Sequence, residues 1–90
     1  MAEEQSSQIQ VKVTFPASPK HPYEAKDSPQ TTVGQVLTAA MSHFEVHDDT
    51  QFNFVLSYEG ERKDPATTIG SLADHSDEIR FTLIKVITSG

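Results

Sequence analysis

The chain has 90 residues, enough for one small domain, and contains no cysteine. Without cysteine it cannot build a disulfide framework, a thiolate zinc site, an iron–sulfur cluster or a cysteine nucleophile. Lys and Arg total 7 against 13 Asp and Glu, a net charge of −6, whereas nucleic-acid binders usually carry a basic face. The longest apolar run, residues 54–56, is too short for a membrane helix or a signal-peptide core. We therefore expect a cytoplasmic protein that binds neither nucleic acid nor membrane.

The first third of the chain predicts a hairpin. Residues 1–7 are polar and are expected to form a flexible lead-in. Apolar residues then alternate with polar ones from Gln8 onward, which is typical of a half-buried strand. Pro16 and Pro19 end that strand, and residues 21–26 predict a second strand, with Tyr23 facing inward. The alternating inward residues of the first strand are Ile9, Val11, Val13 and Phe15.

A helix is predicted over residues 33–44. Thr32 followed by Gln35 has the spacing of a capping box, in which each residue bonds the main chain of the other. The apolar residues that follow lie on one helical stripe. They are Val33, Val36, Leu37, Ala40 and Phe44.

The second half predicts three further strands and one helical turn. Alternation over residues 52–58 predicts a strand, residues 59–61 a turn, and residues 62–63 a short edge strand. Residues 68–73 predict a short helical turn, and residues 78–87 a long strand with Ile79, Phe81 and Leu83 inward. Residues 88–90 are expected to form a flexible tail. The predicted domain, residues 8–87, is therefore α+β: one sheet covered by one helix.

Five segments in this order resemble the ubiquitin-like β-grasp family, especially its divergent prokaryotic members. They are Gln8-Ile9-Gln10-Val11-Lys12, Thr32-Val33-Gly34-Gln35-Val36-Leu37, Phe54-Val55-Leu56-Ser57-Tyr58-Glu59-Gly60, Thr68-Ile69-Gly70-Ser71-Leu72 and Ile79-Arg80-Phe81-Thr82-Leu83. The resemblance spans about residues 8–86. It implies a mixed sheet of four to five strands, with the first and last strands parallel at its centre. It also implies a projecting C-terminus.

The sequence departs from ubiquitin on the outer face of the sheet. Ubiquitin meets its partners there through an apolar patch, and the matching residues here are the polar Ser57, Arg80 and Thr82. Val55 and Ile84 are apolar and share that face. If the strands pair as in the family, these two residues lie near one another diagonally. We expect them to replace the usual partner contact; the alternative is that they are ordinary exposed aliphatic residues.

The C-terminus departs as well. Conjugated family members and sulfur carriers usually end in Gly-Gly, because side chains would obstruct the narrow channel through which an activating enzyme draws the terminal carboxylate. This chain ends Thr88-Ser89-Gly90. The resemblance implies a modifier or carrier activated at Gly90 by an ATP-dependent enzyme and conjugated to target proteins, with the tail beginning near Val86. A non-covalent interaction module is the alternative, and a sulfur carrier is the third.

The sequence offers no pattern typical of an enzyme or of a cofactor site. His43 and His47 have a spacing that can place two imidazoles on one helical face, but the zinc-protease pattern would need Glu where Phe44 stands. A histidine near a helix C-terminus is also favoured by the helix dipole alone. We therefore expect no catalytic residues, no metal and no cofactor, and an acidic monomer.

Overall fold

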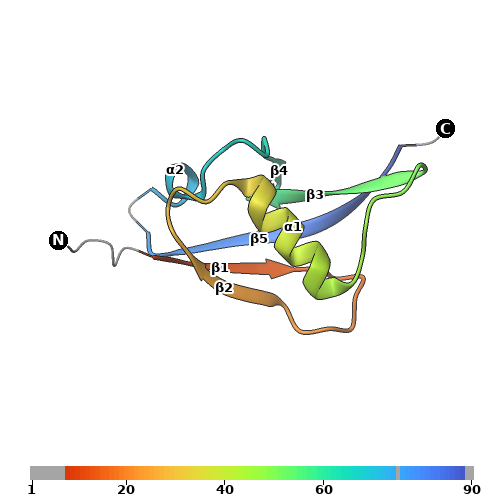
Figure 1. Ribbon diagram of the computed structural model, residues 1–90, viewed down its shortest axis with the longest axis horizontal. Helices are drawn as coiled ribbons and strands as arrows, with labels where there is room; N and C mark the ends of the chain where they lie inside the picture. The colour runs from red at the N-terminus through yellow and green to blue at the C-terminus, as the bar shows by residue number, and fades with distance from the viewer. Residues whose placement is uncertain (1–7, 75, 89–90) are drawn as a thin grey trace.

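The computed structural model describes residues 8–74 and 76–88. Its strands are β1 (Ile9–Thr14), β2 (Tyr23–Asp27), β3 (Phe52–Tyr58), β4 (Glu61–Arg62) and β5 (Glu78–Ile87), and its helices are α1 (Val33–Phe44) and α2 (Ile69–Ala73). The strands form one mixed sheet in the order β2-β1-β5-β3-β4. In Figure 1, α1 crosses one face of this sheet. The predicted α+β class and the β-grasp arrangement are confirmed, including the central parallel pair of β1 and β5.

The core lies between α1 and the inner face of the sheet. Alternate residues of β1, β3 and β5 point into it, because successive side chains of a strand face opposite sides. Val11 and Val13 are completely buried there, and so is Ala40 from the helix. The aromatic rings of Phe15, Phe44 and Phe54 meet edge to face at the C-terminal end of the helix.

The helix begins as its sequence predicts. The Thr32 hydroxyl accepts the Gln35 main-chain N–H at 3.2 Å, and the Gln35 side-chain oxygen accepts the Thr32 N–H at 3.0 Å. The helix ends after Phe44, where Glu45 adopts a left-handed conformation with φ 59°.

The bounds of three strands differ from prediction, and β1 is the shortened one, spanning Ile9–Thr14 rather than Gln8 to Phe15. Strand β2 begins at Tyr23 rather than residue 21, since Pro22 has no N–H to donate to the ladder, and it continues to Asp27, which pairs with Ile9. Strand β4 begins at Glu61 rather than residue 62. Glu59 and Gly60 both have positive φ, 54° and 85°, so they form a two-residue hairpin turn that pairs Tyr58 directly with Glu61.

The two helices start from loops that bond to each other reciprocally. Both loops read Pro-x-Thr-Thr-(Val/Ile)-Gly, once at residues 29–34 and once at residues 65–70. The Gly34 N–H donates to the Pro65 carbonyl and the Gly70 N–H to the Pro29 carbonyl, each at 2.9 Å. The Val33 N–H donates to Thr67 and the Ile69 N–H to Thr31, each at 2.8 Å. This short repeat was not among the predicted features of the chain.

Candidate partner-binding surfaces

The outer face of the sheet holds every polar residue predicted to face a partner. Ser57, Thr82 and Thr14 lie side by side across β3, β5 and β1, because Ser57 pairs with Thr82 and Thr82 with Thr14. This hydroxyl row forms part of the lining of a concave surface of about 620 Å³. Arg80 lies on the same surface, and its Nε is 3.4 Å from the Glu78 carboxylate.

Ser57 is buried although it lies on the outer face. The residue as a whole is 6% exposed, and its hydroxyl forms no hydrogen bond with any described residue. Its register partners Thr82 and Arg62 flank it on either side. The alternation of the strand predicted the face of Ser57 but could not predict its burial, which depends on the neighbouring strands.

Val55 and Ile84 lie directly opposite each other, not diagonally as expected. The register of β3 and β5 pairs them, so the two side chains form one contact on the outer face. Ile84 is 39% exposed and Val55 is half-buried. Val86 is two residues further along β5 on the same face, so the apolar strip continues toward the C-terminus.

The end of β5 corrects the expected start of the tail. Val86 and Ile87 are paired with Asn53 and Phe52 of β3, so they belong to the strand. Thr88 donates its N–H to the Gln51 carbonyl at 2.9 Å. Ser89 and Gly90, and with them the predicted conjugation site, lie outside the described residues, as does the expected lead-in, residues 1–7. Figure 1 shows β3 and β5 running past the end of β1 toward this end of the chain.

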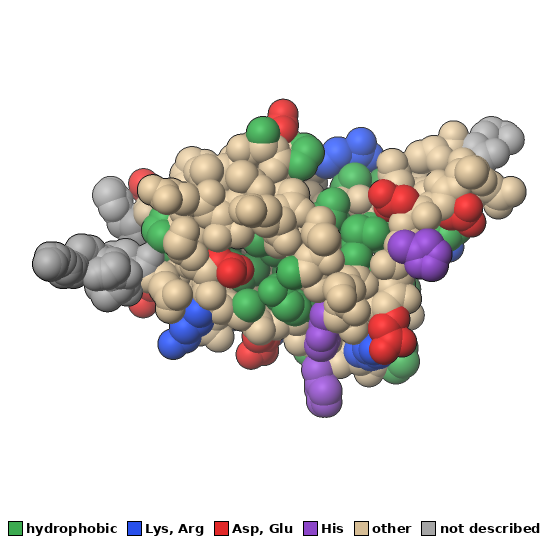
Figure 2. All heavy atoms as spheres, in the orientation of Figure 1, with side chains coloured by type: hydrophobic (Ala, Val, Ile, Leu, Met, Phe, Trp, Pro, Cys, Tyr) green, Lys and Arg blue, Asp and Glu red, His purple; other side chains and the backbone are tan. Residues whose placement is uncertain are grey.

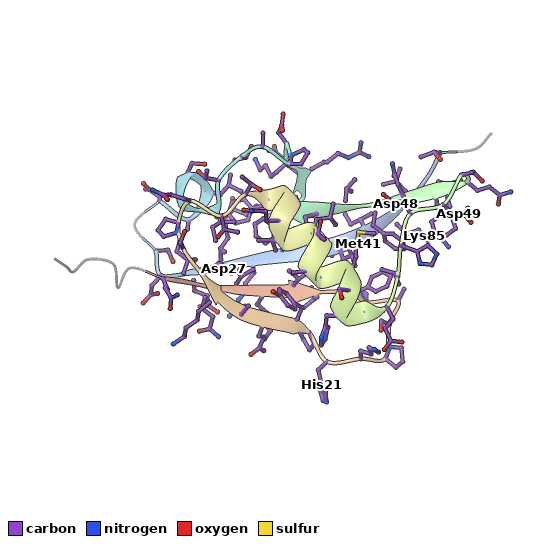
Figure 3. The ribbon with its side chains drawn as sticks, in the orientation of Figure 1. His21, Asp27, Met41, Asp48, Asp49 and Lys85 are labelled. Atoms are coloured by element: carbon purple, nitrogen blue, oxygen red, sulfur yellow. The ribbon has the colours of Figure 1, made fainter. Side chains whose placement is uncertain are left out.

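The β1–β2 loop is fastened to the end of α1. Lys20 Nζ is 2.8 Å from the Glu45 carboxylate and donates to the His43 carbonyl at 3.2 Å. The hydrogen bond that Lys20 donates to the Glu45 carboxylate, and then the charge of Lys20, hold the pKa of Glu45 below its usual value. The His43 ring nitrogen Nε2 is 2.9 Å from the carbonyl oxygen of His21, the exposed loop residue labelled in Figure 3.

The two histidines singled out by spacing do not share a helical face. The helix ends before His47, and the left-handed Glu45 turns the chain away. His47 lines an apolar hollow instead. Within residues 8–74 and 76–88, no group of three or more His, Cys, Asp or Glu residues could hold a metal ion. No helix in those same ranges is long and apolar enough to cross a membrane.

Comparison with known proteins identifies the class. The family model of BilA ubiquitin-like domain 2 matches residues 10–86, so the chain belongs to that family of ubiquitin-like proteins. Proteins with this fold are generally not enzymes themselves and work through contacts with partner proteins. No curated protein sequence matches the chain.

Solved structures agree with this class. The ubiquitin of Caldiarchaeum subterraneum is 26% identical, with a TM-score of 0.72, and the match covers 92% of this chain and 99% of that one. A chain in a structure described as molecular mimicry of SUMO that promotes DNA repair is 14% identical, with a TM-score of 0.65 over 86% of this chain and 90% of the other. A chain in the ATBAG1 complex with HSP70 is 19% identical, with a TM-score of 0.65; the match covers 87% of this chain and 40% of that one. The last two likenesses concern the fold alone.

Proposed function

We propose that this ubiquitin-like protein is a modifier or carrier that an ATP-dependent activating enzyme loads through the Gly90 carboxylate. In such a reaction the carboxylate attacks the α-phosphate of ATP, releasing pyrophosphate, and the resulting acyl-adenylate passes to an enzyme cysteine as a thioester, releasing AMP. Conjugation then moves the acyl group to an amine of a target protein, which frees the cysteine.

The observation that carries this proposal is the position of Thr88, the last described residue. The paired strands β3 and β5 form a two-stranded ribbon that extends past β1, and the Thr88 N–H donates to the Gln51 carbonyl at its end, two residues before Gly90 in the sequence. Two extended residues reach about 7 Å. An activating enzyme would therefore have to bind the ribbon itself. The Val55–Ile84 contact would then lie at the entrance of the enzyme's active-site cleft.

Intact-mass spectrometry with ATP and lysate from the source organism tests the covalent step. The full chain is compared with a chain lacking Ser89 and Gly90, and with a chain carrying extra residues after Gly90. The proposal predicts a thioester or isopeptide species with the full chain alone. The same product from the extended chain, in the absence of any trimming, would contradict it.

A non-covalent interaction module is the second candidate. The observation that favours it is the polar character of Ser57, Arg80 and Thr82, which match the positions of the apolar patch through which ubiquitin meets its partners. Under this function, all three chains in the same experiment keep their mass and retain the same bound protein. A thiocarboxylate on Gly90, seen as a gain of sulfur in place of oxygen, would instead identify the third alternative, a sulfur carrier.

A further inference from the structure

The protruding part of the ribbon consists of residues 52–56 of β3 and 83–87 of β5. Its two edges differ in whether their main-chain N–H and C=O groups are covered. On the β3 edge, a carboxylate oxygen of Asp48 accepts the Phe54 N–H at 2.9 Å, and the Asp49 N–H donates to the Phe52 carbonyl at 2.9 Å. Figure 3 shows both aspartates on the loop that leads into β3. This loop occupies main-chain groups to which another strand would otherwise bond.

The β5 edge of the ribbon has no such cover among the described residues. Strand β1 pairs with β5 only as far as Thr82, so residues 83–87 have a neighbouring strand on one side alone. The Thr88–Gln51 hydrogen bond fixes the alternation of the β3–β5 ladder, in which Ile84 and Val86 bond to β3. The N–H and C=O groups of Lys85 and Ile87 therefore point toward the open side.

Hydrophobic side chains along this edge are also exposed to solvent. Ile84 is 39% exposed and Ile87 66%, and they are the exposed large hydrophobic residues of the described chain. An open strand edge flanked by apolar side chains tends to pair with another strand. Lys85 has no carboxylate within salt-bridge distance among the described residues; its Nζ lies 4.1 Å from the centre of the Phe52 ring.

An apolar hollow lies beside the open edge, on the helix side of the sheet. It has a volume of about 320 Å³, and Lys85 and His47 are at its border. Figure 2 shows hydrophobic side chains gathered between α1 and the ribbon. The aromatic and aliphatic lining residues are Phe15, Ala17, Val46, Phe52 and Phe54.

We propose that the open edge, residues 83–87, is a strand-addition site for an extended segment of a partner protein. The segment pairs with the main chain of Lys85 and Ile87 and places an aromatic or large aliphatic side chain in the hollow. A carboxylate two residues away in the segment lies on the same face and meets Lys85. This site is independent of any covalent use of Gly90.

A designed peptide tests the proposal with the full chain. The probe is acetyl-Thr-Asp-Val-Phe-Val-Asp-Thr-amide, in which Asp, Phe and Asp share one face and which reads the same in both directions. It is titrated into the isotope-labelled protein, and amide hydrogen exchange is followed by NMR. We expect saturable binding and slower exchange at Lys85 and Ile87. A probe with Phe replaced by Ala, and one with both Asp replaced by Asn, should bind more weakly.

Three protein variants separate main-chain pairing at the open edge from non-specific adhesion to the surface. Ile87→Pro removes an N–H that points to the open side and leaves the ladder to β3 intact, so we expect binding about tenfold weaker. Ile87→Val keeps both the N–H and a branched side chain and should bind normally. Lys85→Gln should lose the preference for Asp over Asn in the probe.

Three results would overturn the proposal. The first is no saturable change at Lys85 and Ile87, which includes protection confined to the β2 edge at residues 23–27. The second is equal binding by Ile87→Pro and Ile87→Val. The third is a dimer of the free protein, seen by light scattering, that protects the same amides and would make a second copy the occupant.

Discussion

Gly70 occupies a position where no side chain fits. A Cβ added there would lie 2.7 Å from the Pro29 carbonyl oxygen, a main-chain atom held in place by the reciprocal loop bonds. The equivalent atom at Gly34 would lie 3.2 Å from the Pro65 oxygen, which is a tight contact but not a forbidden one. The two members of the repeat therefore differ in their tolerance of a methyl group.

We predict that Gly70→Ala lowers the free energy of unfolding by about 1–3 kcal/mol, the usual cost of forcing atoms into a packed site. Gly34→Ala should be nearly neutral, because alanine gains up to about 1 kcal/mol over glycine within a helix and offsets the contact. Urea unfolding of both variants measures the difference. Equal losses would contradict the geometric argument.

Glu45 gives a pH-dependent test of the loop contact. Its lowered pKa means that the folded state favours the carboxylate, so the contribution to stability is present above the ordinary value of 4.5 and is lost as the pH falls through the lowered one. We predict that an NMR titration of the Glu45 carboxyl has its midpoint below 4.5, and that Lys20→Gln moves it back toward that value. The same midpoint in both proteins would show that Lys20 does not hold the carboxylate.

At the scale of elements, hydrophobic periodicity predicted the helix and the strands that bury one face in the core. The helix over residues 33–44 and the strands over residues 52–58 and 78–87 have the predicted bounds, because each has a continuous apolar pattern. The contact between the two loops that precede the helices was not predicted. It consists of main-chain hydrogen bonds, which produce no periodic pattern of hydrophobic residues. The open edge of β5 was not predicted either, because it depends on where β1 stops relative to β5.

The cover on the β3 edge can be removed by one substitution. Asp48→Ala deletes the acceptor of the Phe54 N–H, so we predict faster hydrogen exchange at Phe54 with the sheet otherwise intact. Asp49→Ala is the matched control. Among the described residues its carboxylate bonds to neighbouring Thr50 alone, and its own N–H, which donates to the Phe52 carbonyl, remains. Unchanged exchange at Phe54 in Asp48→Ala would show that Asp48 does not protect the edge.

At the scale of the whole molecule, the proposed function needs the outer face and the chain end to work together. Ile84 lies on the outer face, on the strand that leads to Gly90. We predict that Ile84→Asp slows loading by the activating enzyme about tenfold or more, as expected for a charge placed in an apolar contact. Gln10→Asp is the control, because it adds the same charge at an exposed outer-face position on β1. Equal loading of the two variants would show that Ile84 does not contact the activating enzyme.

The most direct test of conjugation through Gly90 is a search for residues 86–90 attached to target proteins. Lys85 is the last Lys or Arg, so trypsin leaves the branch Val-Ile-Thr-Ser-Gly, residues 86–90, wherever the protein has been conjugated. Cells of the source organism are digested and analysed by tandem mass spectrometry. We predict lysine-containing peptides that carry this branch through an isopeptide bond. Recovery of residues 86–90 solely as a linear peptide with a free carboxylate would contradict conjugation through Gly90. The function would then be that of a non-covalent interaction module.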